Sequence, residues 1–192
     1  MKSLFIVLSL LLLSGCGFQE APVMKVYRIV IPPATTVCSG GYRHKILKVA
    51  YPVAMGEKLN DAMYYSYSLL DRGAYLNSRW ANDAGKMLQG FLVQTLTRAN
   101  LFKVVVPVRS ELEENFRLES TLFDFSHHVR GNTSYAVFSI QLVLIDTESG
   151  QLLKSHRFRY REPTHTLDAK GYAEAVNRIM IKMSRDLIAW LR

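Results

Sequence analysis

Cysteine is scarce in this sequence, with two residues in 192, at positions 16 and 38. Two cysteines cannot build a disulfide framework, so a packed apolar core has to hold the fold. Apolar residues make up 49% of the chain and charged residues 21%, which is enough apolar material for such a core. This composition excludes collagenous, coiled-coil and fully disordered chains, and the length fits one domain.

Catalytic and cofactor motifs are also missing. The sequence contains no G-x-S-x-G, HExxH or CxxC motif and no glycine-rich loop between a strand and a helix. The histidine pair His127-His128 falls in a predicted strand, where adjacent side chains point to opposite faces and cannot share a metal ion. We expect these histidines to face solvent or to have a minor structural role. The sequence therefore predicts no catalytic residue, no metal site and no cofactor.

A long apolar run occurs at the N-terminus, over Leu4–Leu13, and is interrupted by Ser9. A helix of ten residues is about 15 Å long, half the thickness of a bilayer core, so a permanent membrane span is disfavoured. Lys2 precedes the run and small residues follow it, which is typical of an export signal.

The residues Leu13-Ser14-Gly15-Cys16 resemble the lipobox of bacterial lipoproteins. The resemblance implies cleavage before Cys16 and acylation of that cysteine, and several acyl chains on one residue form a stable anchor. Residues 1–15 are then the signal peptide, and residues 16–24 the lipidated N-terminus and tether. The alternative is an ordinary secretory signal cleaved near Ser14 or Gly15. Gly17 favours the outer membrane, because enterobacterial lipoproteins retained in the inner membrane carry aspartate there.

Acylation of Cys16 leaves Cys38 without an intramolecular partner, and we expect an inert, partly buried thiol there. The net charge of +8 falls by one, to +7, when Lys2 leaves with the signal peptide. On an exported lipoprotein this charge favours an anionic membrane surface or an acidic protein partner over nucleic acid.

Apolar periodicity divides residues 25–192 into strands and two helices. Strands are predicted over residues 24–31, 45–53, 64–70, 74–76, 101–108, 116–129, 135–145 and 151–161. The first helix is predicted from Ser78 to Ala99, with Ser78 or Asn77 as N-cap and Asn100 as the stop, and the second closes the chain. The order predicts an α+β fold: a single domain with an antiparallel-rich mixed sheet and two amphipathic helices packed on one face.

Alternation predicts which side chains each strand buries. Over residues 45–53 one face holds Leu47, Val49, Tyr51 and Val53. Over residues 116–129, Phe123 and Phe125 lie on the face opposite Leu118 and Leu122. Over residues 135–145 one face holds Ala136, Phe138, Ile140, Leu142 and Leu144. The stripe of the C-terminal helix consists of Tyr172, Val176, Ile179, Met180, Met183, Leu187 and Trp190.

Tyrosines gather in a predicted β-hairpin around the turn Asp71-Arg72-Gly73, whose glycine can take a positive φ. They are Tyr64, Tyr65, Tyr67 and Tyr75. Tyrosine suits a protein interface because it combines apolar area with a polar tip, although half of these rings should face the core. Alternation predicts that Tyr64 is more exposed than Tyr67. The candidate interface residues of the hairpin are Tyr64, Tyr65 and Tyr75.

Arg157, Arg159 and Arg161 follow one another at a spacing of two, which puts three guanidinium groups on one face of a strand. The densest basic region of the chain adds Lys154, His156 and Arg130 to them. The three arginines are candidates for a surface that binds anionic head groups or an acidic partner. The alternative is a solvated strand face whose charges prevent edge-to-edge pairing.

In the order of these features the chain resembles the ABC-type transport auxiliary lipoprotein family, which serves lipid-transport systems with mammalian-cell-entry (MCE) domains. The resemblance covers about residues 25–191 and departs in the loop Pro32–Arg43. The matching features are Lys45–Val49, Pro52-Val53, the tyrosine hairpin, Trp80 opening the first helix, Leu88, Leu92, Leu96, Leu101–Val105, Phe125 and the helix Ala173–Trp190.

The resemblance implies a periplasm-facing domain of a Gram-negative envelope, anchored at Cys16, that assists a transporter of phospholipids or other hydrophobic molecules. Its partners would be the MCE-domain substrate-binding subunit, the permease and the ATPase, and ATP hydrolysis would belong to another subunit. Docking is expected through an exposed strand edge or the tyrosine hairpin. Two other interpretations stay open, a lipoprotein activator of a cell-wall synthase and a carrier that binds lipid itself. A homo-oligomer is compatible with all three.

Overall fold

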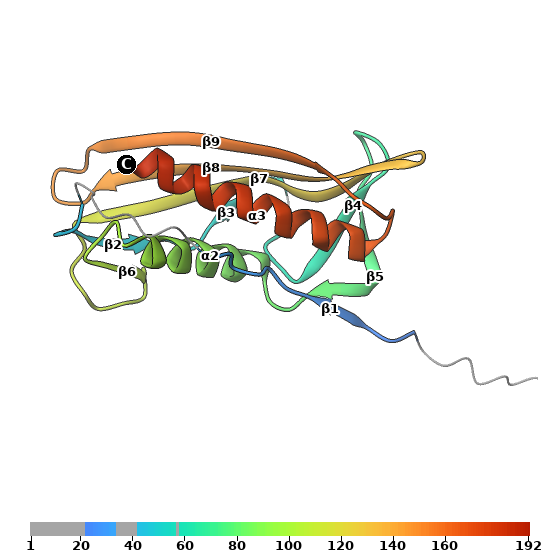
Figure 1. Ribbon diagram of the computed structural model, residues 1–192, viewed down its shortest axis with the longest axis horizontal. Coiled ribbons are helices and arrows are strands. Elements are labelled where there is room, and N and C mark those ends of the chain that lie inside the picture. The colour runs from blue at the N-terminus through green and yellow to red at the C-terminus, as the bar shows by residue number, and fades with distance from the viewer. Residues whose placement is uncertain (1–21, 34–41, 57) are drawn as a thin grey trace, which may run out of the picture.

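The fold is a single layer of sheet with helices on one side. The computed structural model describes residues 22–33, 42–56 and 58–192, which form a nine-stranded mixed sheet and two helices (Figure 1). This is the predicted α+β single domain. In the described ranges, no helix combines the length and the apolar character that spanning a bilayer requires.

The longest strand, β7 (Phe116–Arg130), organises the sheet. Along one edge it pairs over its whole length with β8 (Thr133–Asp146), which pairs in turn with β9 (Leu152–Pro163), so these strands form the predicted antiparallel meander. Along its other edge β7 pairs in parallel with three short strands in succession, namely β2 (Ile46–Val49), β3 (Val53–Ala54) and β4 (Ala62–Ser66).

The remaining elements extend this frame. Strand β5 (Gly73–Trp80) forms the predicted hairpin with β4, β1 (Lys25–Tyr27) lies parallel to β5, and β6 (Val104–Pro107) lies parallel to β2. Helices α2 (Ala84–Ala99) and α3 (Ala169–Leu191) cover the same face of the sheet, as predicted, with α3 running along β8 and β9 (Figure 1).

The core lies between the helices and the sheet. All five predicted inward side chains of β8 are fully buried, and so is the predicted stripe of α3 up to Leu187, while Trp190 is half-buried. An aromatic cluster joins the layers, because the Trp80 ring stacks on Phe125 with ring centres 5.2 Å apart and meets the edge of Tyr172 at 5.5 Å. The opposite face of the sheet, which we call the outer face, is covered by neither of the two described helices (Figure 1).

The predicted faces of β7 are wrong beyond its middle. Leu118, Leu122 and Phe125 are all buried on the helix side, whereas Phe123 is half-buried. The cause is a β-bulge, since Leu122 pairs with Ile140 and Asp124 already pairs with the next residue of β8. Phe123 is the extra residue, and an extra residue reverses the alternation for the rest of the strand.

The first helix begins later than predicted, at Ala84 instead of Ser78. Trp80 ends strand β5, where its backbone N–H donates to the carbonyl of Asp61 (2.8 Å). The N-cap is Asp83, whose carboxylate accepts from the Lys86 N–H at 3.0 Å, so the predicted caps Ser78 and Asn77 are wrong. The predicted stop at Asn100 is confirmed, because that residue adopts the left-handed conformation (φ 55°).

The first two predicted strands are shorter than expected, and the strand predicted over residues 101–108 is reduced to β6. After Tyr27 the first strand leaves the sheet, and the Val30 N–H donates to the side chain of Asn177 on α3 (2.6 Å). The strand predicted over residues 45–53 is divided into β2 and β3 around Pro52, which cannot donate to a ladder. Tyr51 and Val53 are consequently 44% and 60% exposed, not inward as predicted.

Candidate docking site: the hairpin and the edge strand

The predicted tyrosines of the hairpin divide between its body and its loop. Tyr64 and Tyr65 in β4 and Tyr75 in β5 are half-buried, while Tyr67 is 61% exposed. The prediction that Tyr64 is more exposed than Tyr67 is therefore wrong. Strand β4 ends at Ser66, so Tyr67 belongs to the loop, where strand alternation no longer applies.

On the helix side, Tyr75 fastens the hairpin to β7. Its hydroxyl lies 2.7 Å from Nδ1 of His127, and the His127 ring stacks on Tyr172 of α3 with centres 5.4 Å apart. His127 is fully buried, so of the two roles that we expected, solvent exposure is wrong for this residue. His128 lies on the outer face, as alternation predicts. Burial raises the pKa of Tyr75 and lowers the pKa of His127 to about 4, so both rings are neutral at pH 7.

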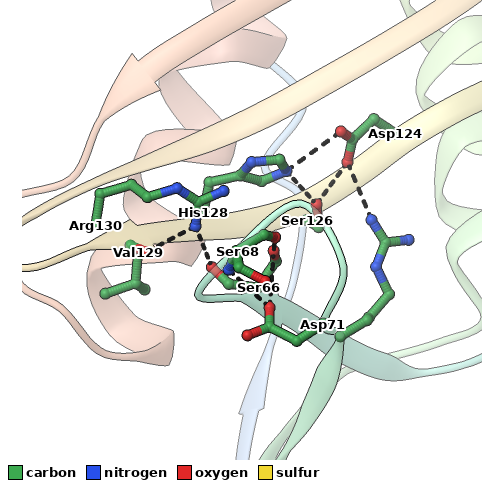
Figure 2. A network of polar contacts seen from close by, with 9 residues as sticks. Ser66, Ser68, Asp71, Asp124, Ser126, His128, Val129 and Arg130 are labelled. Atoms are coloured by element: carbon green, nitrogen blue, oxygen red, sulfur yellow. Dashed lines mark hydrogen bonds and ion pairs between the residues drawn. The ribbon is translucent and has the colours of Figure 1, made fainter.

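Asp71 holds the hairpin loop in one shape. Its carboxylate accepts hydrogen bonds from the N–H groups of Tyr67 (2.7 Å) and Ser68 (2.8 Å) and from the Ser66 hydroxyl (3.2 Å), as Figure 2 shows for the serines. These bonds hold the pKa of Asp71 below its usual value. The guanidinium of Arg130 donates to the carbonyls of Ser66 (3.1 Å) and Val129 (2.8 Å), which ties the loop to β7 (Figure 2).

Gly73 closes this loop for a reason other than the predicted one. Its φ is not positive, in contrast to Gly131 and Gly150 in the turns of the meander. A Cβ at position 73 would instead lie 2.5 Å from the ring of Tyr65, so glycine leaves room for that ring.

A serine, a histidine and an aspartate meet on the outer face of β7 beside this loop (Figure 2). The Ser126 hydroxyl donates to Asp124 (2.5 Å), and Nε2 of His128 lies 3.0 Å from Ser126 Oγ and 3.3 Å from Asp124 Oδ2. A catalytic triad needs the aspartate on Nδ1 of the histidine and the serine on Nε2. Here both partners share Nε2 and Ser126 is fully buried, so the group is a structural network.

The tip of the hairpin exposes two leucines that our interpretation of the sequence did not single out. Leu69 is 93% exposed and Leu70 is 99% exposed, next to the exposed ring of Tyr67. The available signal was two consecutive leucines directly before a turn, where polar residues are the norm.

The three predicted arginines lie together on the outer face of β9, all of them exposed. The guanidinium of Arg157 lies 3.7 Å from the centre of the Phe123 ring, and that of Arg161 lies 3.7 Å from the centre of the Tyr135 ring. Such stacking holds a cation in place while its outer side stays accessible.

The wider basic region does not gather around these arginines. Lys154 lies on the helix side, where its ammonium donates to the carbonyl of Trp190 (2.8 Å), and His156 packs against Phe158. Arg130 braces the hairpin loop. Alternation along β9 separates Lys154 and His156 from the row at 157, 159 and 161.

Strand β9 also offers a free edge. Within the part of the chain that the structure describes, β9 pairs with β8 alone, so its other edge carries no strand. An unpaired edge presents backbone N–H and C=O groups that an additional strand can bind. Cys16 and Cys38 lie outside the described residues.

A single sheet with both described helices on one face and a projecting hairpin defines a small α+β domain. The chain belongs to the family described as the ABC-type transport auxiliary lipoprotein component, whose model matches residues 73–188, from β5 into α3. Membership makes the chain a lipoprotein of the bacterial cell envelope that associates with a transport system.

Solved structures share the fold. The protein XCC0632 from Xanthomonas campestris superposes with a TM-score of 0.77 at 16% identity, over 86% of this chain and 94% of that one. A second crystal structure, of an uncharacterized protein, gives a TM-score of 0.65 at 16% identity, over 87% of this chain and 97% of that one. No curated protein matches the sequence.

Proposed function

We propose that this protein is a lipid-anchored docking subunit of an ABC-type transporter that moves phospholipids or other hydrophobic molecules across the envelope. Acyl chains on Cys16 hold it at a membrane, the outer membrane in view of Gly17. The domain binds the MCE-domain substrate-binding subunit, and a separate subunit hydrolyses ATP. The observation that carries the proposal is the free edge of β9 with its row of ordered arginines.

The edge provides both affinity and selectivity. A partner strand added to β9 gains main-chain hydrogen bonds, and alternate side chains of that strand would meet the outer face. Arg157, Arg159 and Arg161 select an acidic partner there, because charges of opposite sign steer association. Since Arg157 and Arg161 are already stacked on aromatic rings, they lose little side-chain freedom on binding.

Packing favours docking over carriage of lipid. The inward-facing apolar side chains of β8 and α3 fill the space between the helices and the sheet, and their exposed fractions are at or near zero. A carrier needs room for acyl chains inside this layer, and close-packed interiors do not open without a large cost.

The anchor is tested with Cys16→Ala. We expect a folded protein without acyl chains that leaves the membrane and fails to support the envelope barrier to hydrophobic compounds. The matched control is Cys38→Ala, which should keep both acylation and function, because Cys38 is predicted to be inert. Normal barrier function in the Cys16→Ala strain would contradict the tether.

The docking edge is tested in cells with a photoreactive amino acid in place of Arg159. We expect it to capture the MCE-domain subunit, whereas the same probe in place of Lys170, an exposed residue of α3, should not. Capture of a peptidoglycan polymerase from position 159 would instead identify an activator of cell-wall synthesis. Equal capture of the MCE-domain subunit from both positions would contradict the proposal that it docks on the edge of β9.

A further inference from the structure

The hairpin tip exposes apolar surface on a loop that is well ordered by its own hydrogen bonds. Leu69 and Leu70 are almost fully exposed. The loop that carries them is held by Asp71 and tied to β7 through Arg130 (Figure 2). Residues of a fixed loop cannot turn their side chains inward by local rearrangement. Exposed apolar clusters on such supports mark contact sites.

The tip lies at the end of the molecule from which the chain enters the domain. Strand β1 is parallel to β5 with Lys25 opposite Ser78, so the chain before Lys25 points towards the level of Gly73. Figure 1 shows β1 and the hairpin at the same end of the long axis. Ser78 is five positions after Gly73, which corresponds to about 17 Å along β5.

The tether is long enough for the tip to reach the anchoring membrane. Lys25 is nine positions after Cys16, and nine extended residues span at most about 30 Å. This exceeds the distance of about 17 Å between the level of Lys25 and that of Gly73, at the base of the loop that carries the tip. An anchor on Cys16 therefore places a bilayer within reach of the hairpin.

We propose that Leu69 and Leu70 enter the interfacial layer of the phospholipid bilayer that holds Cys16, with Tyr67 at the level of the head groups. The proposal rests on the proposed function, because that function supplies the anchor. Leucine gains free energy on leaving water, and tyrosine prefers the boundary between acyl chains and head groups. In this orientation the hairpin end of the domain contacts the bilayer, and the edge of β9 stays accessible to a protein partner.

Tryptophan fluorescence tests this orientation in the full acylated protein, reconstituted into vesicles of phosphatidylethanolamine and phosphatidylglycerol. Leu70→Trp places the reporter at the tip, and Leu152→Trp is the matched control, an exposed leucine (62%) at the other end. Leu152 pairs with Ile145 of β8, whereas Tyr135 of β8 lies at the level of the hairpin. Ile145 and Tyr135 are ten residues apart in this strand, so the two levels are about 33 Å apart.

We expect the emission of Leu70→Trp to shift to shorter wavelength and to be quenched by lipids brominated on their acyl chains, beyond the quenching of the parent protein. Leu152→Trp should show neither effect. An acylated protein in which position 70 is not quenched overturns the inference and leaves the anchor standing. Equal quenching at both positions also overturns it, because the domain then lies flat. Mass spectrometry that finds no acyl chain on Cys16 overturns the proposed function and this inference with it.

Discussion

Gly171→Ala lowers the free energy of unfolding by about 2–3 kcal/mol, the cost of forcing an extra carbon into a filled site. Alanine is the better helix former by about 1 kcal/mol, so propensity alone predicts the opposite sign. At position 171, however, a Cβ would lie 2.3 Å from the backbone carbonyl oxygen of Thr166 and 2.9 Å from its backbone nitrogen. Backbone atoms cannot move aside as a flexible side chain does.

The site explains why the clash is costly. The Gly171 N–H donates to the capping carboxylate of Asp168 at 2.9 Å, and Asp168 also accepts from the Thr166 hydroxyl at 2.5 Å. Moving Thr166 away from a new methyl group therefore disturbs the N-cap of α3, and a lost cap costs about 1 kcal/mol.

A matched control exists in the other helix. Gly90 lies within α2, and a Cβ there would meet nothing within 4 Å. Gly90→Ala should raise the free energy of unfolding by about 0.5–1 kcal/mol through helix propensity. Urea denaturation of both variants measures the contrast. If Gly171→Ala instead stabilises the protein, the loop before α3 leaves room for a Cβ at position 171 and the predicted clash with Thr166 is wrong.

The contribution of His127 to the free energy of unfolding falls by about 3 kcal/mol as the pH drops from 6.5 to 4, because this ring must stay neutral in the fold. Its pKa is 6.5 in the unfolded chain and about 4 in the folded one. Between these values the unfolded state binds the extra proton, so this contribution to stability is complete above pH 6.5 and is lost as the pH falls towards 4. Burial is the main cause of the lowered pKa, and His128 adds to it.

Few groups around His127 could stabilise its protonated ring. Tyr75 contacts Nδ1, the ring of Tyr172 covers one face, and Nε2 has no hydrogen-bond partner among the described residues. Asp168 favours the protonated form, but its effect is smaller than that of burial. The positive charge would therefore be poorly compensated inside the core.

The measurement is the free energy of unfolding against pH for two histidine variants. His127→Gln keeps a polar group near Tyr75 and removes the titration, so its stability should change much less between pH 6.5 and pH 4. His128→Gln, on the outer face, should retain most of the slope of the parent protein, because burial is the main cause of the lowered pKa of His127. Parallel slopes in the parent and in His127→Gln would assign the pH dependence to other groups.

Much of the secondary structure follows from local periodicity. The inward face of β8 and the stripe of α3 are as predicted, since each is an uninterrupted pattern with one buried side. The turns with Gly131 and Gly150 have the positive φ that such turns need. In the candidate site, alternation correctly places Arg157, Arg159 and Arg161 on one exposed face.

Other features depend on partners distant in the sequence. The bulge at Phe123 arises from the register between β7 and β8, and it moves Phe125 to the helix side. Trp80 has the spacing of a helix position, yet its backbone pairs with Asp61 and its ring stacks on Phe125. Periodicity describes one segment at a time and cannot include such pairings.

The sequence by itself determined the fold class, the order of elements and the arginine row, and it predicted the anchor at Cys16. Tertiary structure alone decided that His127 is buried beside Tyr75 and that Leu69 and Leu70 stand in solvent. The reason is physical: local spacing sets the direction of a side chain, whereas its burial depends on what the rest of the fold places in front of it.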